Sequence, residues 1–167
     1  MAGNGLHYLT GNDWILIQAK ASRQTFKLGE EIIKEGECPN CVYIIRRGQA
    51  TVELAGSSSR AIVAALGPDD ICGEMSFLEQ GKATAAIIAS EEEVEVDEVE
   101  ACELRAIFAA FPGLASRFYL SLAVILAQRL KVTSKELARE MSLRDRPVSE
   151  SPRGCGIRGT LGRRHQR

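Results

Sequence analysis

The chain has 167 residues, 45% of them hydrophobic and 26% charged, with a formal net charge of -1. This length and composition are typical of a globular domain that buries a hydrophobic core. The charge argues against a general nucleic-acid binder, and no run approaches the roughly 18 apolar residues that a membrane span needs.

The first predicted element is a short helix over residues 13–21. Thr10 and Asp13 have the three-residue spacing of a capping box, and Trp14, Ile17 and Ala21 lie at helical spacing. We therefore expect a helix that begins at a polar cap and presents one apolar face.

Residues 24–99 show a different pattern, of short β-rich runs separated by glycines. Glycines recur there at intervals of 7 to 12 residues. Strands are expected at 24–29, 30–36, 42–48, 50–56, 60–67, 84–90 and 93–99. Such spacing predicts an antiparallel jelly-roll-like β-roll, so the fold class is mainly β with flanking α helices.

The last of these runs is rich in acidic residues. Val94 and Val96 alternate there with Glu93, Glu95 and Asp97. Paired carboxylates raise the alternatives of catalysis or calcium binding, but strict alternation favours a strand with one buried and one solvated face. We expect all three carboxylates on the solvated face.

Helical periodicity returns after Ala101. A break at 111–113 separates a first short helix from a second predicted helix at 114–131. The second helix carries one apolar stripe: Leu114, Phe118, Leu122, Ile125, Leu126 and Leu130. A short seam of nearly heptad spacing follows: Leu126, Leu130, Thr133, Leu137 and Met141. The stripe is expected to pack on the roll, and the seam predicts weak homodimerisation or a protein partner.

The domain is predicted to span residues 1–143, with its C-terminal helices at about 101–143. Residues 144–167 carry seven arginines against Asp145 and Glu150, with little apolar content. We expect this basic tail to be disordered. It is interpreted as a solvated terminus or as a contact for nucleic acid or anionic lipid. The residues after Leu130 are too few for a helix-turn-helix, so no DNA-binding domain is expected.

The five cysteines are an odd number, in a chain without a segment that resembles a signal peptide. Reduced thiols and a cytoplasmic location are therefore expected. Cys38 and Cys41 form a CPNC pair, for which an ordinary turn is favoured over metal or redox chemistry. With His7 and His165 as the only histidines, and without a phosphate-loop motif, we expect no enzyme, no metal and no cofactor.

The stretch GEMSFLEQGKATAA, at residues 73–86, has the residue types of a ligand-binding turn. Gly73 allows a close approach of the backbone, and Glu74 can accept a hydrogen bond from a sugar hydroxyl. Exposed backbone N–H groups favour an anion, so the turn suggests a sugar phosphate. The alternative for Glu74 is that it caps the backbone N–H groups of the turn, and Met75, Phe77 and Leu78 are expected to be core residues of the turn.

The order of a helix, a glycine-punctuated roll and further helices, with a Gly-Glu turn between late strands, resembles the cyclic nucleotide-binding domain family. The resemblance covers residues 9–130. It rests on Phe26, Gly29, Glu30, Ile32, Gly36, the run VYIIRRGQATV and the opening pair Gly73-Glu74. It implies a regulatory domain that senses cyclic AMP or cyclic GMP as a possible ligand.

The resemblance also implies a set of ligand-binding residues: Gly73, Glu74, Met75, Ser76, Lys82, Ala83, Thr84 and Ala85. In the family an arginine pairs with the cyclic phosphate, and Ala83 occupies that position. Loss of one such charged hydrogen bond predicts an affinity lower by about ten- to a hundredfold. The alternative is a degenerate β-roll that acts as a protein-interaction or oligomerisation scaffold.

Overall fold

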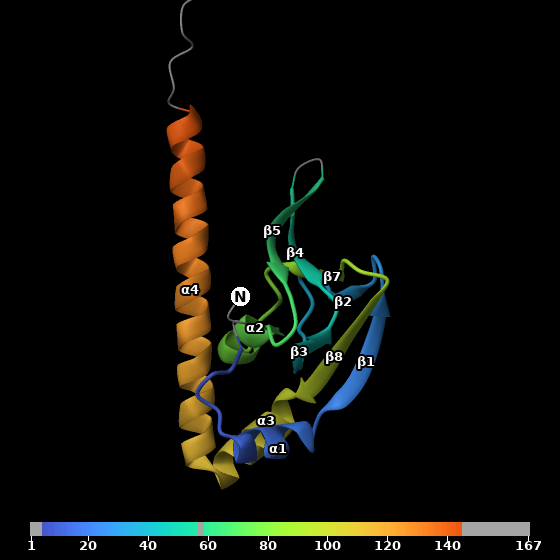
Figure 1. The fold of residues 1–167 in the computed structure, drawn as a ribbon, viewed down its shortest axis with the longest axis vertical. Coiled ribbons are helices and arrows are strands. Elements are labelled where there is room, and N and C mark those ends of the chain that lie inside the picture. The colour runs from blue at the N-terminus through green and yellow to red at the C-terminus, as the bar shows by residue number, and fades with distance from the viewer. Residues whose placement is uncertain (1–4, 57–58, 145–167) are drawn as a thin grey trace, which may run out of the picture. The chain divides into compact units, whose positions relative to one another are not determined.

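The computed structural model describes residues 5–56 and 59–144, which form two antiparallel sheets with flanking helices (Figure 1). The strands are β1 Ser22–Lys27, β2 Glu31–Ile33, β3 Cys41–Arg47, β4 Ala50–Ala55, β5 Arg60–Leu66, β6 Ile71–Cys72, β7 Ala86–Ala89 and β8 Glu93–Glu100. The predicted mainly-β fold with flanking helices is confirmed. The basic tail at 144–167 lies, apart from the backbone of Arg144, outside the described residues.

The strand order is β1-β8-β3-β6 in one sheet and β2-β7-β4-β5 in the other. β8 lies between β1 and β3, pairing Val94 with Phe26 and Val96 with Ile45. In the second sheet β4 lies between β7 and β5, with a register shift between Val52 and Glu53. Apart from the consecutive strands β4 and β5, neighbours in each sheet are distant in sequence, which is the long-range pairing of a roll.

The helices are α1 Gly11–Gln18, α2 Glu74–Glu79, α3 Ala101–Ala110 and α4 Pro112–Arg144. The capping box predicted for α1 is present: Thr10 Oγ1 accepts from the Asp13 N–H, and Asp13 accepts from the Thr10 N–H. The break between α3 and α4 falls at Phe111, as expected before a proline. The structure divides into two units inside α4, between Lys131 and Val132. None of the described helices has the length and apolarity to cross a bilayer.

Two apolar clusters form the core. The helix-side cluster consists of Leu6, Ile17, Val42, Ile44, Ile71, Phe77, Val99, Ala101, Leu104, Ile107, Phe108, Leu114, Phe118, Leu122 and Ile125. The roll-interior cluster consists of Ile32, Ile33, Ile45, Ala50, Leu66, Cys72, Ala83, Ile87, Ala89, Val94 and Val96. Successive side chains of a strand point to opposite faces, so β3 and β8 contribute to both clusters.

The α4 stripe packs as predicted only over its first half. Leu114, Phe118, Leu122 and Ile125 are each 1% exposed, and Leu126 is half-buried. Leu130 is 67% exposed, so its place in the packed stripe was predicted wrongly.

Asp97 on β8 also departs from the expectation of a solvated face. Its side chain is buried, and it accepts hydrogen bonds from Nε of Arg23 and Nε of Arg46. The Arg46 guanidinium also lies over the Trp14 ring, 5.2 Å from its centroid. The alternation of apolar and acidic residues along β8 predicts that the Asp97 side chain is exposed to solvent. Two arginines from the neighbouring strands allow this carboxylate to be buried instead.

The β5 strand is the edge of its sheet, and it is exposed at every position but Leu66. Its exposed side chains include Ile62 and Val63. The sequence run RAIVAAL is therefore a strand, as predicted, but an edge strand with apolar side chains in solvent.

Candidate functional site

The turn at Gly73 is built by the short strand β6 and helix α2. Gly73 has φ of 81°, and a Cβ at this position would lie 2.8 Å from the carbonyl oxygen of Cys41. Both the left-handed backbone and the close approach to β3 require glycine. The Phe77 N–H then donates to the Gly73 carbonyl at 3.0 Å, which closes the first turn of α2.

Glu74, the residue after this turn, is 4% exposed and faces α4. Nη1 of Arg129 donates to Oε1 of Glu74, and Nη2 of Arg129 donates to the Ile71 carbonyl at 2.6 Å. Burial raises the pKa of the Glu74 carboxyl, and the Arg129 charge acts against that rise. Glu74 is thus mainly the partner of an arginine rather than a cap of the turn.

Ala83 lies in the roll-interior cluster and is 8% exposed. Its N–H donates to the Glu37 carbonyl at 2.7 Å, and its carbonyl accepts from the Gly36 N–H at 2.8 Å. The backbone at this position is therefore held by the loop that follows β2. Its methyl group supplies no charge.

The other predicted ligand residues are divided between α2 and the segment before β7. Ser76 is buried, whereas Met75 is 43% exposed. Lys82 and Thr84 are exposed and Ala85 is half-buried. Lys82 has no carboxylate within 4.0 Å among the residues that the structure describes.

The core expected within α2 is smaller than predicted. Phe77 is buried against Phe108 and Phe118, with ring centroids 6.3 and 6.2 Å away. Met75 and Leu78 are 43% and 40% exposed, so their assignment to the core was wrong. A six-residue helix has one narrow buried face, and only Phe77 of these three lies on it.

Arg129 is the functional residue that sequence reasoning missed. It follows Leu122 by seven residues and Ile125 by four, which places it on the buried face of α4. An arginine at the next position of an apolar stripe needs a buried acceptor, and that was the available signal. The acceptor, Glu74, lies 55 positions earlier in the chain.

The CPNC pair precedes and begins β3. Cys38 is exposed, Cys41 is half-buried, and both are free thiols. Burial raises the pKa of the Cys41 thiol to about 12. Within 5–56 and 59–144 no three His, Cys, Asp or Glu side chains gather as a metal site would require.

Comparisons with known proteins agree with this geometry. The family model described as "Cyclic nucleotide-binding domain" matches residues 23–111. Cyclic GMP-binding protein C of Dictyostelium discoideum is 35% identical over 130 residues, which are 73% of this chain and 5% of that protein. The Cyclic AMP receptor protein of Thermus thermophilus is 30% identical over 144 residues, 82% of this chain and 62% of the relative.

A solved cyclic nucleotide-binding domain from Methylobacillus flagellatus has the same fold. It superposes with a TM-score of 0.73 at 16% identity, covering 79% of this chain and 74% of that one. The chain spans less than two thirds of both curated relatives. The likeness therefore concerns only a part of each of these two relatives.

Proposed function

Because the chain belongs to the cyclic nucleotide-binding domain family, we propose that it is a regulatory module that senses cyclic AMP or cyclic GMP at the Gly73-Glu74 turn. The observation that supports this most is the ion pair between the buried Glu74 and the half-buried Arg129. The pair brings together a carboxylate that can accept from a ribose hydroxyl and a guanidinium that can donate to a phosphate. At the position where the family has its phosphate-binding arginine, this chain has Ala83.

Arg129 has the chemistry that Ala83 lacks. A guanidinium has five N–H donors, and two of them are used by Glu74 and by the Ile71 carbonyl. The remaining donors are available to a phosphate oxygen, and the planar fork suits an oxyanion better than the ammonium of Lys82. We assign the phosphate contact to Arg129 and the ribose 2′-hydroxyl contact to Glu74.

The other assignments follow the turn. Gly73, Met75 and Ser76 present backbone to the ligand, while Thr84 and Ala85 line the approach from the β7 side. The proposal includes no catalytic step, no metal and no cofactor.

The test is calorimetric titration of the full chain with cyclic AMP, cyclic GMP and their 2′-deoxy analogues. Wild type is expected to bind one of the two nucleotides and to bind its 2′-deoxy analogue more weakly. Arg129→Ala is expected to lose at least about tenfold in affinity, the value of a charged hydrogen bond. Arg129→Lys should lose less, since it keeps the charge without the fork. In Glu74→Gln the difference in affinity between the cyclic nucleotide and its 2′-deoxy analogue should become smaller.

Arg139→Ala is the matched control, because Arg139 is an exposed arginine on the same helix. It should bind like wild type, and thermal unfolding of each variant should show that it is folded. Absence of binding to both nucleotides at millimolar concentration, or unchanged affinity in Arg129→Ala, would contradict the proposal.

The second candidate function is a scaffold that keeps the roll and does not bind nucleotide. It is favoured by three apolar side chains that are exposed on one face of α4: Leu130, Leu137 and Met141. Such a face suits a weak homodimer or the helix of a protein partner. Self-association of a chain that releases or absorbs no heat when either nucleotide is titrated into it would favour the scaffold over the sensor.

A further inference from the structure

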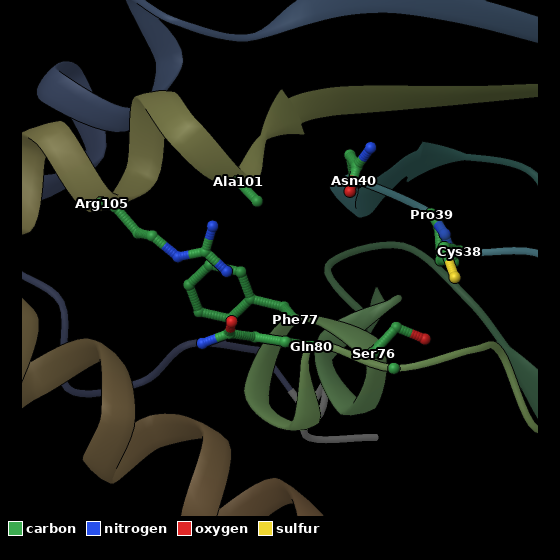
Figure 2. A pocket seen from close by; sticks show the side chains of 9 residues that line it. Cys38, Pro39, Asn40, Ser76, Phe77, Gln80, Ala101 and Arg105 are labelled. Carbon is green, nitrogen blue, oxygen red and sulfur yellow. The ribbon is translucent and has the colours of Figure 1, made fainter.

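A second pocket lies on a different side of α2 from Glu74. It has a volume of about 250 Å³ and is formed by the loop that carries Cys38 and Asn40, by α2 with Gln80 and Gly81 after it, and by the first turns of α3 (Figure 2). Neither Glu74 nor Arg129 lines it. Of the residues assigned to the cyclic nucleotide, Ser76 alone also lines this pocket, so the two sites adjoin at α2 without sharing a charged side chain.

Unpaired polar side chains line this pocket. Ser76 is 7% exposed, and none of the side-chain hydrogen bonds within 5–56 and 59–144 uses its hydroxyl. The side-chain amides of Asn40 and Gln80 are likewise without a protein partner among those residues. Asn40 and Gln80 are exposed and can bond to water, whereas Ser76 is almost entirely buried, and its hydroxyl without a protein partner indicates a polar occupant.

The charge of the lining is positive. Arg105 lies over the Phe77 ring at 5.4 Å from its centroid, which leaves the N–H edges of its guanidinium free. No carboxylate lies within 4.0 Å of Arg105 in the part of the chain that the structure describes, and none lines the pocket. Figure 2 shows Arg105 and Gln80 beside the Phe77 ring, with Ser76 and Asn40 farther along the pocket.

Of the acidic residues near the start of α3, Glu103 is paired with Nζ of Lys20 at 2.8 Å. Glu100 accepts only from the Cys102 thiol, so it keeps its charge, but it does not line the pocket. The Ala101 N–H in the pocket wall donates to the Asn40 carbonyl at 2.7 Å, so the ten-residue helix α3 contributes only the field of its dipole there. The local field thus favours a negatively charged occupant over a neutral or a cationic one.

We propose that this pocket binds a small oxyanion, a phosphate or carboxylate group, held by Arg105 and by the side chains of Ser76, Asn40 and Gln80. Drug-sized ligands occupy pockets of roughly 300–1,000 Å³. The smaller volume here suits inorganic phosphate or a short dicarboxylate better than a nucleotide. A bound anion bridges α2 to α3 and so stabilises the helix that carries Glu74.

The exposed thiol of Cys38 in the pocket wall provides the test. Alkylation by iodoacetamide is followed by mass spectrometry while inorganic phosphate or succinate is titrated at constant ionic strength. Cys102 is the internal reference, because it is exposed and does not line the pocket. Either anion is expected to slow the alkylation of Cys38 relative to Cys102, and the more effective one identifies the tetrahedral or the dicarboxylate class.

Arg105→Ala should raise the anion concentration that halves the alkylation rate of Cys38 by about tenfold or more, since a charged hydrogen bond is lost. Arg47→Ala makes the same change at an exposed arginine at the other end of β3 and should leave it unchanged. Ser76→Ala, which removes only the hydroxyl, should weaken protection in the same direction as Arg105→Ala. Absence of protection by both anions, equal slowing of Cys38 and Cys102, or unaltered protection in Arg105→Ala would overturn the proposal. None of these readouts depends on nucleotide binding.

Discussion

Asp13 joins α1 to α4 through its carboxylate. It accepts from the Thr10 N–H, and it receives Nε and Nη2 of Arg117 at 2.8 and 2.7 Å. Arg117 holds the pKa of this carboxyl below its usual range, although burial alone would raise it. A carboxyl with a lowered folded-state pKa stabilises the fold above its unfolded pKa, and this contribution is lost as the pH falls through the folded value.

Asp13→Asn is therefore expected to lower the free energy of unfolding by about 1.5–3 kcal/mol at pH 7, the value of hydrogen bonds to charged groups. Urea unfolding across the acid range should show the difference from wild type shrinking as the pH falls below 3.8, the unfolded reference value. Asp69→Asn changes an exposed carboxylate and should cost little. A difference that stayed constant with pH would contradict the assigned role of Asp13.

Ala83→Arg is expected to strengthen cyclic nucleotide binding by about ten- to a hundredfold, by adding a charged hydrogen bond to the phosphate. Adding Glu74→Ala should abolish that gain. The gain should be larger in an Arg129→Ala background, where the phosphate has no other arginine; calorimetry of the double-mutant cycle measures this coupling. Since Ala83 is buried, thermal unfolding must show that each variant folds. Equal gains in both backgrounds would mean that Arg129 does not contact the phosphate.

Gly73 and Gly29 allow the backbone of the turn to be tested. Both have φ near 82°, but a Cβ at Gly29 meets nothing within 4 Å, whereas at Gly73 it meets the Cys41 carbonyl oxygen. Gly29→Ala should lower the free energy of unfolding by about 1–2 kcal/mol, the cost of holding an alanine in the left-handed conformation. Gly73→Ala should cost more in denaturant unfolding, because the backbone must also shift. Equal costs would show that the contact with β3 relaxes freely.

The residues of the candidate site were only partly predictable from the sequence. Gly73, Glu74 and Ala83 lie in one continuous stretch, so a motif could locate them. Arg129 could not be assigned to Glu74, because no local pattern pairs positions 55 residues apart. The neighbours of Asp97 were hidden in the same way: Arg23 and Arg46 come from strands that only the tertiary pairing brings together.

The elements were predicted best where the pattern was long. The seven predicted β runs correspond to seven strands, and the break at Phe111 was located correctly. β6 has two residues, too few to show alternation, and α1 begins and ends earlier than its predicted bounds of 13–21. Each of these departures falls where an element is short.

The exposed apolar face of α4 predicts weak self-association. Leu137 and Met141 are 58% and 61% exposed, and burying them against a second copy removes apolar area from water. Sedimentation at high protein concentration should show a monomer–dimer equilibrium that Leu137→Glu shifts toward monomer. Ala138→Glu, at an exposed neighbouring position, is the control for added charge. A wild type that stays monomeric at millimolar concentration would remove the homodimer.

At the scale of the whole molecule, β3 couples the two apolar clusters. Ile44 belongs to the helix-side cluster and Ile45 to the roll-interior cluster, although the two are adjacent in the chain. The helices and the roll therefore cannot unfold independently without exposing one face of β3.

Ile45→Ala and Leu122→Ala test this coupling, since each removes a fully buried side chain from a different cluster. Each should lower the free energy of unfolding by about 2–5 kcal/mol. Circular dichroism of the strands and near-ultraviolet signals of the α2–α4 aromatic residues should shift together in one transition. Two separated transitions in either variant would show that the clusters unfold separately.

The exposed edge strand β5 also affects how the protein behaves in concentrated solution. Unpaired backbone N–H and C=O groups, with Ile62 and Val63 in solvent, form a template on which the same strand of another molecule can align. The six residues after Arg60 carry no charge and no proline, which is the composition of an aggregation-prone segment. We therefore expect β5 to limit how far the folded protein can be concentrated, and Val63→Lys to raise its solubility by placing a charge on the exposed edge.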